Sequence, residues 1–169
     1  MKFRAAAIFG CVVLLTRQAA AQLGCAGATC TVEISLPVAD VLKLSIGGSG
    51  VALGTPTDAD YVAGFRDGSA LSVTVSANRP VVVQVAGMAS TFSYAGSMTN
   101  SAKPASDLRW ATSAVALSST TNHMGSLLTF VSQNAGSTVT PLHLRTRWSY
   151  ATDVPGSYSL GISFTLSAP

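Results

Sequence analysis

The stretch Leu142-His143-Leu144-Arg145-Thr146-Arg147-Trp148-Ser149-Tyr150 decides the fold class of this chain. Apolar, aromatic or β-branched side chains occupy every second position, and polar or basic side chains lie between them. Because successive side chains of a β-strand point to opposite faces, this alternation predicts a strand with one buried face. A second alternating run, Tyr158–Leu166, follows the turn signal Pro155-Gly156, so we expect the two runs to form a hairpin.

The rest of the chain is also typical of strands. Longer strands are predicted at Thr31–Leu36, Val41–Ile46, Leu71–Ser76 and Val81–Val85, and shorter ones at Phe92–Tyr94, Leu108–Thr112, Val115–Leu117 and Leu127–Ser132. The best helical candidate, Thr57–Gly68, is interrupted by Gly64, so no convincing helix is expected. About seven to nine strands predict an all-β fold, an antiparallel immunoglobulin-like β-sandwich, with a small barrel as the alternative.

Length and composition agree with a single globular domain. The chain has 169 residues, of which 48% are hydrophobic and only 10% are charged. A disordered chain needs low hydrophobicity and high net charge. Coiled coils are rich in Glu, Lys and Arg. Both classes are therefore excluded.

The N-terminus has the layout of a secretory signal peptide. Lys2 and Arg4 precede the uncharged apolar run Ala5–Leu15, and Ala19 and Ala21 are the small residues before a cleavage site. The apolar run is shorter than the roughly 20 residues of a membrane span. We expect a signal peptide at residues 1–21 and one domain at 22–169, periplasmic, extracellular or on the cell surface.

Two alternatives concern the same segment. Arg17 lies between the apolar run and the cut, which favours an uncleaved anchor. Leu23-Gly24-Cys25 allows a lipoprotein signal, although Gln22 stands where such signals have Leu. Membrane association is otherwise expected only through a partner.

Removal of the predicted signal changes the charge of the protein. The precursor has a formal net charge of +3 and a pI of about 9.0. The residues after position 21 include seven basic and seven acidic side chains. The basic pI therefore supports no nucleic-acid interaction, and a neutral surface permits contacts between copies.

Cys25 and Cys30 are expected to form a small-loop disulfide, since Cys11 leaves with the signal and exported proteins oxidise paired thiols. The alternative is a metal or redox pair. A zinc site needs about four ligands, and the chain's two histidines, His123 and His143, are distant in sequence. No metal or other cofactor is expected.

The sequence offers no catalytic signature, and we expect a protein that is not an enzyme. No Gly-x-Ser-x-Gly nucleophile elbow occurs, and Ser157 lies at the start of a predicted strand. Asp58 and Asp60 could bind calcium, but turn capping is the simpler interpretation.

Two Arg–Trp pairs are the candidate interface residues. Arg145 and Arg147 share a face of the predicted strand, and Trp148 follows them; Arg109 and Trp110 form the second pair. Arg and Trp are enriched at the centres of protein interfaces. The alternative places both Trp side chains in the core and leaves the Arg side chains in solvent.

The order of these features resembles that of exported bacterial β-sandwich subunits of the pilin and spore-coat-protein-U type. The matching residues are Cys25 and Cys30, then Pro155-Gly156-Ser157-Tyr158 leading into the alternating run Leu160–Leu166. The resemblance implies a secreted single domain that assembles by donating a strand to a neighbour's incomplete sheet.

The expected function is that of a non-enzymatic structural or adhesive subunit of the cell envelope, acting through protein–protein contacts, including contacts with copies of itself. An accessory subunit docked on the periplasmic face of a membrane complex is the second hypothesis. A carbohydrate-binding module that uses Tyr61, Tyr94 or Trp110 is the third.

Overall fold

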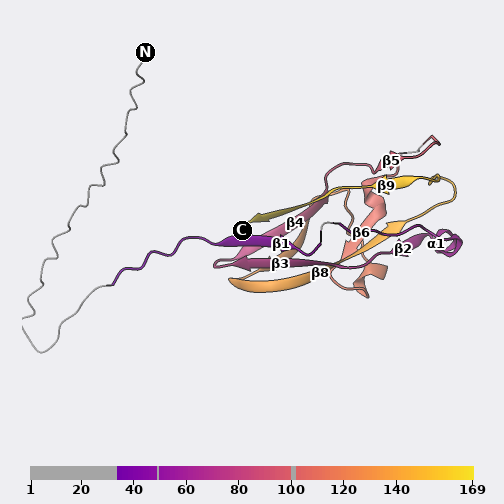
Figure 1. The fold of residues 1–169 in the computed structure, drawn as a ribbon. Helices are drawn as coiled ribbons and strands as arrows, with labels where there is room; N and C mark the ends of the chain where they lie inside the picture. Colours follow the sequence, from indigo (N-terminus) through magenta and orange to yellow (C-terminus); the bar gives the residue numbers. More distant parts are fainter. Residues whose placement is uncertain (1–33, 49, 100–101) are drawn as a thin grey trace, which may run out of the picture. The chain divides into compact units, whose positions relative to one another are not determined.

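The computed structural model describes residues 34–48, 50–99 and 102–169 (Figure 1). The chain divides into two units, Met1–Pro37 and Val38–Pro169. The predicted signal peptide, Cys25, Cys30 and the start of the predicted strand Thr31–Leu36 lie outside the described residues. Ile34–Leu36 is described and takes no regular secondary structure, so that part of the strand prediction is wrong.

The second unit is built almost entirely from antiparallel strands, which confirms the all-β class. In chain order the elements are β1 (Leu42–Ile46), α1 (Asp58–Ala63), β2 (Phe65–Asp67), β3 (Leu71–Ala77), β4 (Val81–Gly87), β5 (Ser93–Ala95), the 3₁₀ turn η1 (Ala105–Asp107), β6 (Leu108–Ala111), the 3₁₀ turn η2 (Ala116–Ser118), β7 (Leu128–Gln133), β8 (Gly136–Arg147), β9 (Ser157–Ser159) and β10 (Ile162–Ser167). The described residues hold ten strands rather than seven to nine, because β2, β5 and β9 are three-residue strands.

Strand β8 organises the larger sheet (Figure 1). Its first half pairs with β3, and its second half pairs with β2 and with β6. Strand β1 adds to the far side of β3. All these pairings are antiparallel, so this five-stranded sheet is held by contacts between segments distant in sequence.

The second sheet has β4 at its centre, between β10 and β7. A small third sheet pairs β5 with β9. The predicted C-terminal hairpin is therefore wrong: β8 and β10 lie in different sheets. The run 158–166 is also interrupted between β9 and β10. Gly161 lies at this interruption, and a side chain there would collide with Met88, because its Cβ would lie 2.8 Å from the Met88 sulfur.

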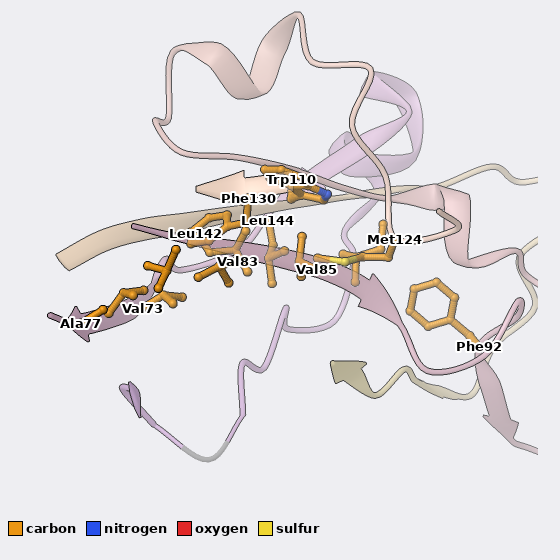
Figure 2. Close-up of a cluster of buried hydrophobic side chains, with 13 residues drawn as sticks. Val73, Ala77, Val83, Val85, Phe92, Trp110, Met124, Phe130, Leu142 and Leu144 are labelled. Carbon is orange, nitrogen blue, oxygen red and sulfur yellow. The ribbon is translucent and has the colours of Figure 1, made fainter. Parts of the chain in front are cut away.

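Both larger sheets contribute to one buried apolar cluster (Figure 2). The buried positions of β3, β4 and β8 alternate with half-buried or exposed ones, as predicted for strands with one core face. Trp110 of β6 meets Phe130 of β7 with ring centroids 5.7 Å apart, and Phe130 meets Phe164 of β10 at 6.1 Å. The first of these edge-on contacts joins the two sheets, and the second links β7 and β10 within the second sheet.

Two further local expectations fail. The strand predicted through Tyr150 ends at Arg147, where the Trp148 amide donates to the Gly64 carbonyl instead of to a neighbouring strand. Val115–Leu117 was predicted as a strand and instead overlaps η2, whose turn is stabilised by hydrogen bonds from Ser118 to Val115. Short apolar runs do not distinguish strands from turns by periodicity alone.

Helix α1 was not expected, and its ends explain how so short a helix forms. Thr57 and Asp60 make a reciprocal capping box, and Arg66 donates to the Asp60 carboxylate at 2.7 Å. Gly64 ends the helix with φ +78°, a conformation that glycine adopts without a steric penalty. Asp60 therefore caps a helix, as the simpler interpretation held.

The capping box predicts a pH-dependent contribution to stability. Hydrogen bonds from the Thr57 amide, the Thr57 hydroxyl and Arg66 lower the pKa of Asp60 below 3.8. The folded state therefore binds fewer protons than the unfolded state, so the contribution is present above about pH 4 and disappears as the pH falls through the folded pKa. Asp60→Asn should lower the free energy of unfolding at pH 7 and lower it by much less at pH 2.5, measured by urea denaturation.

The matched control is Asp40→Asn, because Asp40 is an exposed carboxylate whose ion pair with Arg79 lies at the surface. Equal losses for the two variants at pH 7 would contradict this account of Asp60.

Candidate functional site

The predicted arginines gather on one face of the β2–β8–β6 part of the sheet. Arg145 and Arg147 alternate along β8, and Arg109 of β6 is the cross-strand partner of Arg145. Asp67 of β2 is the partner of Arg145 on the other side. We call Arg109, Arg145 and Arg147 the arginine face.

Arg145 is the fixed centre of the arginine face. Its Nε donates to Asp67 Oδ1 at 2.5 Å and its Nη2 donates to Asp67 Oδ2 at 2.8 Å. Its guanidinium lies 3.8 Å from the Phe65 ring centroid, and its side chain is only 14% exposed. The hydrogen bonds to Asp67 raise the pKa of Arg145. This paired and stacked guanidinium is therefore held rigidly.

The other two arginines are less constrained. Arg109 Nη1 donates to the Thr120 carbonyl at 3.1 Å, and its side chain remains half-buried. Arg147 is exposed. Cross-strand like charges repel, so Asp67 compensates the charge of the Arg109–Arg145 pair.

Trp110, the other candidate interface residue, does not belong to the arginine face. It follows Arg109 in the strand, so its side chain points to the opposite face and is only 2% exposed (Figure 2). The prediction that this Trp fills the core is the one confirmed. Burial also removes Trp110 from the set of aromatic side chains available to a carbohydrate.

The other aromatic side chains of that set belong to one chain of ring contacts, in which Trp148 contacts Tyr61 at 5.9 Å and Tyr158 at 5.8 Å. Tyr61 stacks on Tyr150, with ring centroids 4.7 Å apart, whereas Tyr94 contacts Tyr158 at 5.2 Å. The Tyr150 hydroxyl donates to Asp58, which raises the pKa of Tyr150. These rings contact other rings and do not form one flat exposed platform.

An apolar groove lies between the open edges of β1 and β10. Among the described strands, β1 pairs with β3 alone and β10 pairs with β4 alone. The groove has a volume of about 400 Å³. Apolar side chains and glycine line it throughout, contributed by β1, the 48–53 loop, β3, β8, the segment after β4, and β10. The core is therefore incompletely covered along this side.

A buried ion-pair cluster surrounds Lys103. The Lys103 and Asp153 side chains are 1% and 3% exposed, and Nζ lies 2.9 Å from Asp153 Oδ1. Nζ also lies 3.3 Å from Asp107 Oδ2 and donates to the Arg147 carbonyl at 2.5 Å. The Trp148 ring centroid is 4.5 Å from Nζ.

A cavity of about 440 Å³ adjoins this cluster. Lys103, Thr146 and Trp148 line it together with the 50–56 loop and residues 156–160. Thr146 Oγ1 and Trp148 Nε1 are buried without a hydrogen-bond partner among the described residues. The cavity thus has a mixed polar and apolar lining that includes two unsatisfied polar groups.

Sequence reasoning missed Lys103 entirely. Its four-residue spacing from Asp107 is the one local signal of an ion pair, and the stretch around it is otherwise small and polar. Its burial depends on Asp153, 50 residues away. A single sequence carries no sign of that contact.

The structure places His143 on β8, where it is the cross-strand partner of Ala111, and His123 in the loop between η2 and β7. His123 Nδ1 accepts a hydrogen bond from the Gly125 amide at 3.2 Å. No group of three or more metal-ligating side chains occurs among residues 34–48, 50–99 and 102–169. Within the same ranges, no helix has the length and apolarity needed to cross a membrane.

No protein-family model, characterised protein or solved structure matches the chain.

The arginine face predicts a salt-dependent defect when Asp67 is removed. Asp67→Asn should lower the free energy of unfolding by about 1 kcal/mol at low ionic strength, because Arg145 loses its partner and faces Arg109 uncompensated. Added salt should recover most of this loss by screening the repulsion. Thermal unfolding at low and high salt measures both effects.

The double variant Asp67→Asn/Arg109→Gln serves as the control, because it removes the repelling charge. It should be more stable than Asp67→Asn alone at low salt. Equal stabilities would show that Arg109 and Arg145 do not interact.

Proposed function

We propose that the chain is an exported, non-enzymatic structural subunit of the cell envelope that assembles with copies of itself. The observation that carries the proposal is the apolar groove between β1 and β10. Both flanking strands have backbone groups free to pair on their groove side, so an extended segment can enter and complete both sheets.

The proposed architecture is an immunoglobulin-like sandwich that lacks cover along one side. The common apolar cluster and the ring contacts among Trp110, Phe130 and Phe164 support two sheets packed face to face. The half-buried side chains of β10 and the exposed Met88 lie where an added strand would cover them.

The proposed occupant is the segment Thr31–Leu36 of a second copy. Val32, Ile34 and Leu36 alternate with polar residues, so an extended conformation directs all three into the groove. Residues 34–36 take no part in a sheet of their own chain. Burial of each apolar side chain contributes about 1.5–3 kcal/mol, and the backbone hydrogen bonds of an added strand contribute further to affinity.

The charge of the protein supports self-association. The residues after the predicted signal carry equal numbers of acidic and basic side chains, so copies do not repel one another strongly. Donation of a segment by one copy to the groove of the next is a head-to-tail contact, which propagates unless it closes into a ring.

Two groups of variants test the proposal from its two sides. Ile34→Asp/Leu36→Asp should disable the donor segment, and Met88→Lys should disable the groove, where Met88 is 74% exposed and thus replaceable without loss of the fold. By sedimentation velocity, the wild-type protein should form oligomers that grow with concentration, whereas each variant alone should remain monomeric.

The mixture of the two variants is the sharper measurement. A copy with a disabled donor still has a groove, and a copy with a disabled groove still has a donor, so an equimolar mixture should stop at heterodimers.

Val115→Lys is the matched control, because Val115 is 86% exposed and does not line the groove. This variant should assemble like the wild type. A wild-type protein that stays monomeric at high concentration, or equal loss of assembly in the control, would refute the proposal.

A further inference from the structure

The cluster around Lys103 has the parts needed for a covalent reaction within the chain. We propose that Lys103 and Asp153 become joined by an amide bond between Lys103 Nζ and Asp153 Cγ, with Asp107 as the proton carrier and one water molecule released. This cross-link is independent of subunit assembly.

Proximity is the first requirement, and the structure meets it. Nζ and the Asp153 carboxylate are in direct contact at 2.9 Å, although their residues come from segments 50 positions apart. Both partners are anchored. The Lys103 carbonyl accepts from the Phe92 amide at 2.8 Å, and Asp153 Oδ2 accepts from the Ser149 amide at 2.8 Å. Reactants held in this way gain a large effective concentration.

Burial supplies the second requirement, exclusion of water from the reacting groups, because the Lys103 and Asp153 side chains are 1% and 3% exposed. In the proposed reaction a proton first moves from Nζ to Asp153 Oδ1 across their hydrogen bond, which gives an amine and a carboxylic acid. The Trp148 ring covers Nζ at 4.5 Å and helps to keep solvent out. The resulting amine and carboxylic acid are the reactive pair.

Amide formation between Lys103 and Asp153 is a condensation that releases water and needs neither an oxidant nor a reductant. The Nζ lone pair attacks Asp153 Cγ, and the carbonyl electron pair moves onto Oδ2, where the Ser149 amide stabilises the developing charge. Asp107 Oδ2 takes a proton from Nζ, from which it is 3.3 Å away, and passes it to the departing Oδ1. The Cγ–Oδ1 bond breaks, water leaves, and the carbonyl re-forms as an amide.

The surroundings also suit the products. The released water has room in the adjoining cavity, where Thr146 Oγ1 and Trp148 Nε1 lack partners among the described residues. The amide N–H can donate to the Arg147 carbonyl, which already receives a hydrogen bond from Nζ. Replacing a buried ion pair by an amide removes two charges whose desolvation is costly.

Peptide mass spectrometry of the folded protein tests for the Lys103–Asp153 amide. Trypsin does not cleave a bond that precedes proline, so it leaves Arg79-Pro80 and Lys103-Pro104 intact. Lys103 and Asp107 therefore stay together in the fragment Asp67–Arg109. Trypsin leaves Asp153 in the fragment 148–169. We expect the two fragments as one species whose mass is their sum less one water, with fragmentation locating the bond at Lys103 and Asp153. Recovery of the two fragments separately, both unmodified, would overturn the proposal.

Two variants separate the chemistry from the packing. Asp107→Asn keeps the Lys103–Asp153 pair but removes the proton carrier, so cross-linking after refolding should be at least about 100-fold slower. Lys103→Arg keeps a cation beside Asp153 that does not form the amide. Linkage in Asp107→Asn at the wild-type rate would contradict the role of Asp107, and its retained urea stability before linkage would show that the fold is intact.

Discussion

The backbone ladder of β8 is the constraint on which the rest of this structure depends. Its twelve residues pair with β3, β2 and β6, so loss of its register would separate three strands at once. The same strand sends Leu142 and Leu144 into the core and Arg145 to the outer surface. A slip by one residue would exchange these faces, burying guanidinium groups and exposing leucines.

The alternation of side chains in single segments was sufficient to predict much of the fold. Val41–Ile46, Leu71–Ser76 and Val81–Val85 correspond closely to β1, β3 and β4, since a half-buried strand carries its own period-two pattern. The arginines at 145 and 147 could be placed on one face by the same rule. Strict alternation along 108–112 also places the Trp110 side chain on the face opposite to Arg109, which is the core face.

Pairing partners could not be predicted in the same way. The C-terminal hairpin was inferred from closeness in sequence, whereas Phe164 pairs with Val85 and Leu142 pairs with Leu71. Lys103 illustrates the same limit for a site, because both its burial and its carboxylate partner arise only from tertiary packing. In a chain with 10% charged residues, one Lys enclosed by two Asp side chains and a Trp ring is the largest concentration of buried polarity described.

The long separation between paired strands has a consequence for the order in which the molecule folds. Strand β3 finds its central neighbour only when residues 136–142 are present, and β4 obtains its second neighbour from the last residues of the chain. Folding dominated by such distant pairings is slow. A ribosome releases the chain from its N-terminus, so the larger sheet can close only after residues 136–147 have been made and the second sheet only after residues 162–167. Until those segments emerge, the nascent polypeptide exposes the apolar strand faces that later form the core.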